Sequence, residues 1–511
     1  MKSKNLIIGT VGFAALSAVF LFSPFNFFKK SASYNKTSLS VLQEQNANDA
    51  AKWLAARYVD LETGERISPE KLNQLINQEK NRKRSNLVFE ELGPDNIGGR
   101  TRAIQPDRFN TNKVWAASIT GGLFYSSDAA NSWNRVEDFP GAPYISSMTQ
   151  TIDGTIFVAT GYSNSSDQWS GNGLYYKTTT GSWQTVPGTE SLSYVDEVVS
   201  SDVTNDVFFA TTSGLKKWAI GQSSFTNIVI PGGNCNALAT SKDGQLIITA
   251  IGSINKIFVS TDGGASFQDK SGNDETVSVP STSGRMEIAI SPTKNSSNKY
   301  STYAIRTGSN LEGMSVSHDN GQLWSQFIGA SGTPSNLDIY RDQGQYNSVV
   351  SVVPNDPEKI LLGGIDVWKW KQNVNNPPAG GFEVLSQWFF SPTSALYVHA
   401  DNHEMKWNSN NRLYIGNDGG IGISDDLAST FYPANRGYNV TQFYGIAMDR
   451  NGSVMGGAQD NGSLYNDFSN ASYKEFTEVG GGDGFECEIS FFNPNVMFSS
   501  VYHNSINRIK R

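Results

Sequence analysis

The stretches "STDGGASF" (260–267) and "SHDNGQLW" (317–324) share one short pattern, Ser-x-Asp-x-Gly-x-x-aromatic. "SSDAANSW" (126–133) and "SDDLASTF" (424–431) keep it with Ala in place of Gly, and "KTTTGSW" (177–183) is a degenerate copy. In such a turn the Ser and Asp side chains can accept hydrogen bonds from backbone N–H groups, and Gly accepts a positive φ. The pattern therefore predicts a recurring tight turn between strands. It assigns a structural role, at the outer rim of the fold, to Asp128, Asp262, Asp319 and Asp426.

The segments around these turns repeat along most of the chain. Nine similar segments, 39 to 58 residues apart, begin at positions 114, 156, 207, 246, 302, 360, 413, 454 and 496. Each reads as strand, small-residue turn and strand, after a shorter strand that ends in a turn. Four antiparallel strands per unit of about 40 to 50 residues are typical of a β-propeller blade. The sequence therefore predicts an all-β fold over residues 86–511, a β-propeller with about nine four-stranded blades.

Closure of the predicted ring has two explanations. The last unit stops at Arg511 after its predicted third strand, and "NLVFEELG" (86–93) looks like a strand without a sheet of its own. That strand could complete the final blade and leave only short edges. The rival explanation is that the chain is a fragment, with further blades or a sorting domain beyond Arg511. Both explanations stay open.

The N-terminal region differs from the repeats. Lys2 and Lys4 precede an apolar run over 6–22, which predicts an export signal within residues 1–30. Cleavage would release a secreted protein, whereas an uncleaved run over 6–28 would attach it to a membrane at the cell surface. Residues 31–85 carry apolar residues at helical spacing and predict a short helical spacer.

Composition excludes several classes of partner. The net charge is −8, so the chain has no electrostatic reason to bind nucleic acid. Two cysteines are too few for a metal–cysteine cluster, and the sequence leaves open whether Cys235 and Cys487 pair. No cofactor is predicted.

The turn pattern resembles the Asp-box, or BNR repeat, of sialidase-like and sortilin-like propellers. Longer phrases, among them "LGPDNIGGRTRAI" (92–104), "LYIGNDGGIGIS" (413–424) and "GGAQDNGS" (456–463), resemble exported sortilin-N-terminal-like BNR-repeat proteins, which are often described as glycosyl hydrolases. The resemblance covers about 86–511. It implies the propeller fold but supplies no particular reaction.

Polar residues beside glycines cluster where the innermost strands and their loops are expected to converge. The predicted ligand-binding residues are Arg100, Arg102, His399, Asp401, His403, Gln459, Asp460 and Asn461. The candidate catalytic carboxylates are Asp95, Asp418 and Asp483. The alternative explanation is that Asp and Asn beside Gly simply form tight turns, as in "NDGG", "QDNG" and "GGDG".

Known catalytic patterns do not match. The F/Y-R-I-P motif of sialidases is absent. Xyloglucanase-like propellers carry an Asp in a T-D-V-G-G-like phrase, and the matching "SITGG" (118–122) has Ile119 at that position. An Ile cannot act as a general base. The preferred prediction is therefore a binding propeller for a glycan or an extracellular protein. The alternative is a glycoside hydrolase with a non-standard carboxylate pair, such as Asp95 with Asp418 or Asp483.

His399 and His403 raise the question of a metal site. On a helix, a spacing of four would place both imidazoles on one face. The repeat instead places "HADNHEMKW" (399–407) on an inner strand, where residues four apart are about 13 Å apart. The sequence therefore predicts no metal centre. It leaves ligand contact and a hydrogen-bonded layer between blades as the two alternatives for these histidines.

Overall fold

The computed structural model describes residues 90–510, apart from 164–167, 252–253, 273–283, 329–336, 374, 377–378 and 470–473, and also positions 67, 71 and 74. All of these residues belong to the unit Ala51–Arg511. The predicted export signal (1–30) and nearly all of the predicted helical spacer (31–85) lie outside the described residues. Among the residues described, no helix is long and apolar enough to cross a membrane.

Nine antiparallel sheets make up the described part of the chain, and in each sheet the strands pair in chain order. The first four sheets contain β1 (Thr101–Pro106), β2 (Val114–Ser118), β3 (Gly122–Ser126), β4 (Asn134–Arg135); β5 (Ile145–Gln150), β6 (Ile156–Thr160), β7 (Leu174–Lys177), β8 (Gln184–Thr185); β9 (Val195–Ser200), β10 (Asp206–Thr211), β11 (Gly214–Ala219), β12 (Thr226–Asn227); β13 (Ala237–Thr240), β14 (Ile247–Ile251), β15 (Lys256–Ser260) and β16 (Gln268–Asp269).

The next three sheets contain β17 (Arg285–Lys294), β18 (Tyr300–Thr307), β19 (Leu311–Ser317), β20 (Ser325–Ile328); β21 (Val349–Val352), β22 (Lys359–Gly363), β23 (Val367–Gln372), β24 (Gly380–Val384); β25 (Asn402–Trp407), β26 (Leu413–Asn417), β27 (Gly420–Ser424) and β28 (Tyr432–Pro433). The last two sheets contain β29 (Phe443–Met448), β30 (Val454–Ala458), β31 (Gly462–Asn466), β32 (Thr477–Gly480); β33 (Cys487–Ile489), β34 (Val496–Val501) and β35 (Ser505–Lys510), with the 3₁₀ turn η2 (Tyr502–Asn504) before β35.

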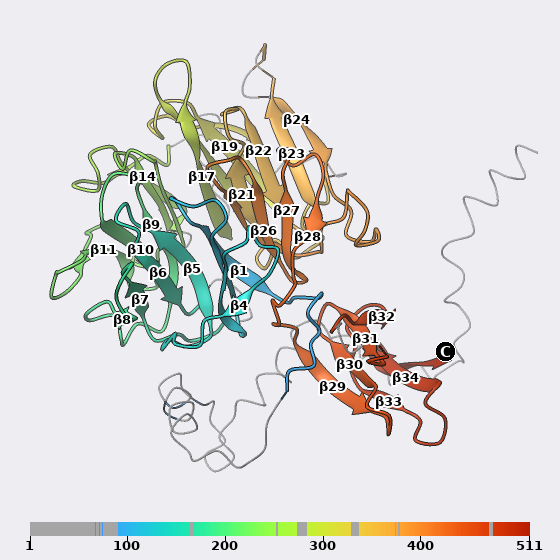
Figure 1. Cartoon of the computed structure of the whole chain (residues 1–511). Coiled ribbons are helices and arrows are strands. Elements are labelled where there is room, and N and C mark those ends of the chain that lie inside the picture. The colour runs from blue at the N-terminus through green and yellow to red at the C-terminus, as the bar shows by residue number, and fades with distance from the viewer. Residues whose placement is uncertain are drawn as a thin grey trace, which may run out of the picture. The chain divides into compact units, whose positions relative to one another are not determined.

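The first seven sheets form a closed ring. Their inner strands β1, β5, β9, β13, β17, β21 and β25 are neighbours in that order, and β25 in turn lies beside β1 (Figure 1). Apolar residues seal the join between the first and seventh sheets: Ile104, Val114, Phe124, Tyr414, Ile421 and Ile423. The fold is therefore a β-propeller. A single ring of all nine units is not observed, because the seventh sheet already packs against the first.

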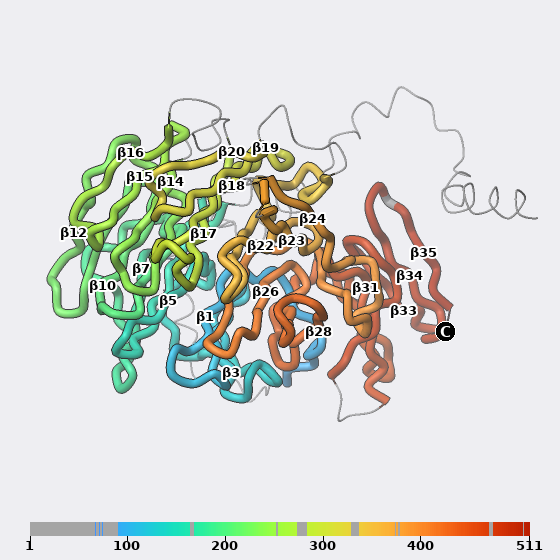
Figure 2. The backbone as a smooth tube through the Cα atoms, turned by 90° about the horizontal axis from the view of Figure 1, so that it is seen from above, coloured from blue at the N-terminus to red at the C-terminus, as the bar shows by residue number. Residues whose placement is uncertain are grey.

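The eighth and ninth sheets follow the ring as a separate pair, red in Figure 2. Their first strands, β29 and β33, contact each other. The predicted strand 86–93 does not complete a blade in its described part, because residues 90–93 form no strand. The segment ends at Gly93. Two residues later, the backbone N–H of Asp95 donates a hydrogen bond to the carbonyl oxygen of Lys474, which lies just before β32.

Burial decreases from the middle of each ring sheet to its outer edge. The second strands, such as β2 and β14, are almost wholly buried, whereas the outermost strands β4, β12, β16 and β28 are two residues long and exposed. Short edge strands limit pairing with other chains. Cys235 and Cys487 are both buried and free, so they do not form a disulfide.

The Ser-x-Asp turns join the third and fourth strands of their sheets. In the turn after β15, Ser260 Oγ donates to Asp262 Oδ1 (2.7 Å), and the N–H and Oγ–H of Ser266 donate to the Asp262 carboxylate (3.0 and 2.5 Å). Gly264 has φ +84°, and Ala130 at the equivalent position has φ +66°. The turns containing Asp128, Asp319 and Asp426 make the same Ser–Asp hydrogen bond.

Candidate functional site

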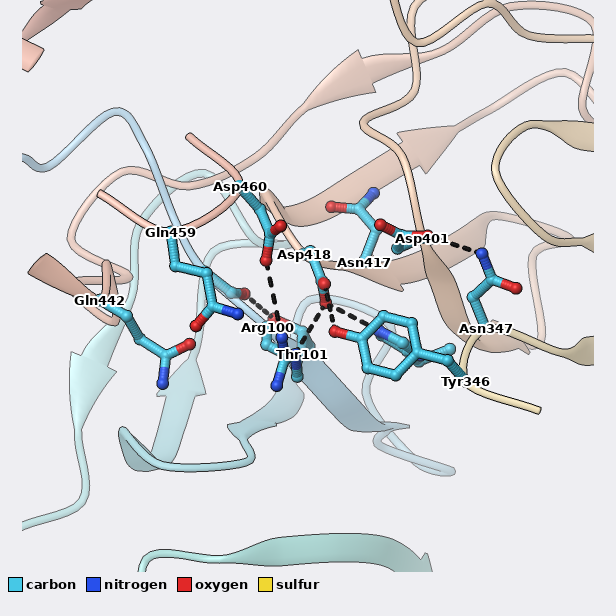
Figure 3. Close-up of polar contacts among 12 residues, drawn as sticks. Arg100, Thr101, Tyr346, Asn347, Asp401, Asn417, Asp418, Gln442, Gln459 and Asp460 are labelled. Carbon is cyan, nitrogen blue, oxygen red and sulfur yellow. Dashed lines mark hydrogen bonds and ion pairs between the residues drawn. The ribbon is translucent and has the colours of Figure 1, made fainter. Parts of the chain in front are cut away.

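One end of the ring collects two kinds of segment, those that precede an inner strand and those that join the second and third strands of a sheet. Arg100 precedes β1, Tyr346 precedes β21 and Asp401 precedes β25. Asp418 lies in the β26–β27 turn, and Asp460 lies in the β30–β31 turn of the eighth sheet. Figure 3 shows these side chains pointing toward one another. The site therefore combines the ring with the sheet that follows it.

Asp418 is the centre of the hydrogen-bond network. Its side chain has no exposed area and accepts hydrogen bonds from Arg100 Nε (3.2 Å), His403 Nε2 (2.7 Å) and the Tyr346 hydroxyl. Burial alone would raise the pKa of Asp418, but Arg100, His403 and Tyr346 together hold it well below its usual range. Asp418 is thus an ionised carboxylate whose oxygens are occupied by protein donors.

Arg100 connects this buried carboxylate with the eighth sheet. Its guanidinium Nη2 lies 3.5 Å from Asp460 Oδ2, and its Cζ lies 4.9 Å from the centre of the Tyr346 ring. The Asp460 side chain keeps 27% of its surface exposed. Burial, followed by the charges of Asp418 and Asp483, raises the pKa of Asp460 well above its usual range. Asp460 is consequently a partly exposed carboxyl group whose surroundings raise its pKa.

Asp401 is the third acid of the cluster. Its Oδ1 accepts a hydrogen bond from Asn347 Nδ2 (2.6 Å), and burial together with the charge of Asp418 raises its pKa to about 7. The backbone of Asp401 (φ +65°) and of Asp460 (φ +58°) is left-handed, a conformation that Asp tolerates better than most residues. A backbone of this kind at two of three clustered acids is typical of functional sites.

Asp401, Asp418 and Asp460 each place one carboxylate oxygen within 4.8 Å of the others. That spacing alone would suit a divalent cation, contrary to the prediction of no metal centre. However, Arg100 already supplies a positive charge, and three donors occupy Asp418. We therefore interpret the group as one ionised carboxylate, Asp418, whose charge helps to raise the pKa of its two neighbours Asp401 and Asp460.

The histidines stabilise the loops around this cluster. His403 is neutral at physiological pH, because burial and, after it, Arg102 lower its pKa to about 3. His399 contacts Ala400 O and Asp460 O through its two ring nitrogens, both at 3.1 Å, and thereby holds the β30–β31 turn. The two imidazoles bond different partners and do not converge on one point.

Three other predicted residues also belong to the β30–β31 turn or contact it. Asn461 donates to Asp418 O (3.0 Å), and Asp483 Oδ1 accepts from the backbone N–H of Asp460 (2.7 Å). Gln459 is buried beside them. Asp95 differs, because its carboxylate pairs with Arg436 (3.2 Å) and forms no hydrogen bond with Asp418 or Asp483. The suggested pairing of Asp95 with either acid therefore has no geometric support among the described residues.

Sequence reasoning missed Tyr346 and Asn347, which supply hydrogen bonds to Asp418 and Asp401. The stretch "GQYNSV" (344–349) that contains them matches no motif. Their position directly before an inner strand was the available signal, because Arg100 and Asp401 occupy the same place in their own sheets.

Comparisons with known proteins support the propeller and correct one prediction. No protein-family model matches the chain. The oligoxyloglucan-reducing end-specific xyloglucanase of Emericella nidulans is 24% identical over an alignment of 338 residues, and the match covers 54% of this chain and 38% of that enzyme. The chain thus spans well under half of the relative's length.

Solved structures with the same fold include the GH74 xyloglucanase from Xanthomonas campestris (TM-score 0.59, 12% identity, covering 82% of this chain and 67% of that one). An ancestral GH74 enzyme has TM-score 0.55 and 15% identity, covering 83% and 69%. The Niastella koreensis GH74 enzyme has TM-score 0.50 and 15% identity, covering 83% and 74%.

These relatives are propeller glycosidases and not sortilin-like proteins. The preference for a binding propeller without enzymatic activity was therefore wrong, and the comparisons favour the alternative, a glycoside hydrolase.

Proposed function

We propose that the chain is a glycoside hydrolase that cleaves a xyloglucan-type glucan at the Asp401–Asp418–Asp460 cluster. The observation that carries the proposal is the cluster itself, three carboxylates with oxygens within 4.8 Å of one another, only one of which is substantially exposed. The xyloglucanase relative and the GH74 structures support the substrate class.

Asp460 is the proposed general acid. A glycosidase needs one protonated carboxyl to donate to the leaving oxygen and one ionised carboxylate near the anomeric carbon. The raised pKa of Asp460 keeps its proton at neutral pH, and its exposure lets a glycosidic oxygen approach.

Asp401 is the proposed nucleophile, because the carboxylate oxygens of Asp418 already accept hydrogen bonds from Arg100, His403 and Tyr346. Once Asp460 holds its proton, Asp401 can ionise and attack the anomeric carbon while Asp460 protonates the departing oxygen. Water then cleaves the glycosyl–Asp401 ester and returns a proton to Asp460. A double displacement of this kind, with a covalent glycosyl–enzyme intermediate, predicts retention of configuration.

Ile119 is the reason for proposing a non-standard pair. It occupies the position of the Asp in the xyloglucanase-like phrase and is fully buried with Ala142, Tyr144, Tyr162 and Trp169. It provides no base, so the acids near the β30–β31 turn must supply the chemistry.

The test is hydrolysis of xyloglucan oligosaccharides, with products measured as new reducing ends. We expect activity in the native chain and a loss of about 10²- to 10⁴-fold in Asp460→Asn and in Asp401→Asn. Asp138→Asn is the matched control, because Asp138 forms an exposed ion pair with Lys177 and should leave activity unchanged. No reducing ends from the native chain, or full activity in Asp460→Asn, would reject the proposal.

A further inference from the structure

Bulges in the inner strands place extra residues near the centre of the ring. The register of β1 shifts between Thr101 and Ala103, so Arg102 is the unpaired residue of a bulge. The register of β25 shifts in the same way between Asn402 and Glu404, at His403. A bulge redirects the side chain of its extra residue and recurs beside functional sites. Arg102 and His403 therefore owe their orientation to the same local feature.

Arg102 contacts segments from sheets that are not neighbours in the ring. Its Cζ lies 4.2 Å from the ring centre of Tyr162, which follows β6, and 5.3 Å from that of Tyr346, which precedes β21. Arg285 of β17 also reaches Tyr162, with its Cζ 6.0 Å from the same ring centre. Residues of the first, second, fifth and sixth sheets can meet only around the axis of a closed ring. This group is the axial cluster: Arg102, Tyr162, Arg285 and Tyr346.

Arg102 is buried, with 4% of its surface exposed, yet its Nε and Nη2 have no hydrogen-bond partner among the described residues. These two N–H groups share one edge of the guanidinium, which is the edge that binds a carboxylate through two parallel hydrogen bonds. The Tyr162 hydroxyl and His403 Nδ1 are buried and unpartnered as well. Unpaired donors of a buried cation are costly and therefore indicate a ligand.

The neighbouring charges do not neutralise Arg102. Arg100 pairs with Asp418 and Asp460, and Arg285 pairs with Glu287 (Nε to Oε1, 2.5 Å). Among the described residues, no carboxylate lies within ion-pair distance of Arg102. Glu287 lies farther away, and the charge of Arg102 partly offsets the rise in the pKa of Glu287 that burial causes. Within the described part of the chain, the Arg102 guanidinium thus has no direct ion-pair partner.

We propose that Arg102 binds an oxyanion on the ring axis, held side-on by Nε and Nη2. The ligand class is a carboxylate, either of an acidic sugar or of a small free acid, and a tetrahedral inorganic oxyanion shares the same chemistry. The two tyrosine rings hold the guanidinium by cation–π contact and leave its edge to the anion. Arg102 contacts none of the three clustered acids, so this binding site is distinct from theirs, although Tyr346 belongs to both networks.

Calorimetric titration of the full chain tests the proposal with three probes: D-glucuronate, D-glucose as its neutral counterpart, and inorganic sulfate. Glucuronate should bind and glucose should not. Arg102→Lys keeps the positive charge but loses the two parallel N–H donors of the guanidinium, so it should weaken glucuronate binding at least about tenfold. Arg135→Gln, on the exposed outer strand β4, is the matched control and should bind as the native chain does.

Sulfate distinguishes the sources of the anion. Sulfate binding equal to that of glucuronate, and equally weakened in Arg102→Lys, supports the oxyanion site but assigns it to a free ion instead of an acidic sugar. Absence of binding by both anions, or unchanged binding in Arg102→Lys, overturns the proposal. If Arg102→Lys does not fold, competition in the native chain decides: sulfate must displace glucuronate, and independent binding of the two overturns the proposal.

Discussion

The propeller has aspartates at its rim and at its centre, and the two environments shift the pKa of the carboxyl group in opposite directions. At the rim, Asp262 is exposed and receives hydrogen bonds from Ser266 and Ser260, which lower its pKa to about 2. At the centre, Asp401 is buried, and desolvation and the nearby Asp418 charge raise its pKa to about 7. The rim carboxylate is satisfied by its own turn, whereas the central one depends on residues from distant parts of the chain.

The difference has a chemical consequence. A carboxylate whose donors lie within four residues is stable but has no capacity left for a reaction. Burial and neighbouring negative charges instead raise the pKa of Asp460, the proposed general acid, and so favour the protonated form that acid catalysis needs. Perturbed pKa values in a cluster therefore indicate function here, while the repeated geometry of the rim turns indicates only the fold.

Replacement of Asp418 should give the largest effect on stability. Asp418→Asn removes the charge that balances Arg100 and the acceptor for His403, both of which are buried. Breaking a buried pair on one side costs about 3–5 kcal/mol. Urea unfolding should show a loss of this size at neutral pH, and a loss below about 1 kcal/mol would mean that the central network is no more important than a rim turn.

The pH dependence of stability should distinguish Asp401 from the rim acids. Its folded pKa of about 7 lies above the unfolded value, so the native state keeps a proton that the unfolded state releases. Stability should therefore fall as pH rises from about 4 to about 7, by up to about 1.4 kcal/mol per pH unit from this group. Asp401→Asn should flatten that slope in urea titrations at several pH values. An unchanged slope would contradict the assignment.

Replacement of a rim acid should give the smallest effect and the opposite pH trend. Asp262→Asn loses local hydrogen bonds worth about 1 kcal/mol or less in an exposed turn. Because the folded pKa is lowered to about 2, the contribution of Asp262 is complete above about pH 4 and disappears as pH falls toward 2. Thermal unfolding should show a smaller difference in Tm between the Asp262→Asn variant and the native chain at pH 2.5 than at pH 7.

The sequence predicted the parts of the fold that are local. Strand pattern, blade length and the turns around Asp128 and Asp262 depend on residues close in the chain. The closure of the ring after seven sheets depends on packing between Ile104 and Tyr414, which no repeat alignment reveals. The site posed the same difficulty, because Arg100 and Asp418 are 318 positions apart and Tyr346 and Asp418 are 72 apart.

The functional prediction failed for a related reason. Two known catalytic patterns are absent, one of them because Ile119 stands where a base is expected, so the sequence favours a binding propeller and leaves a glycoside hydrolase as the alternative. The acids that replace that base in our proposal come from three separate segments around Asp401, Asp418 and Asp460. Their proximity is a property of the folded chain.

The most direct test of the central claim, that Asp460 is a general acid, compares two substrates in one variant. An aryl glycoside with an acidic leaving group needs little protonation, whereas a xyloglucan oligosaccharide needs it fully. We predict that Asp460→Asn loses at least about 100-fold in kcat/KM on the oligosaccharide but stays within about tenfold of the native chain on the aryl glycoside. Equal losses on both substrates, or no loss on the oligosaccharide, would contradict the account.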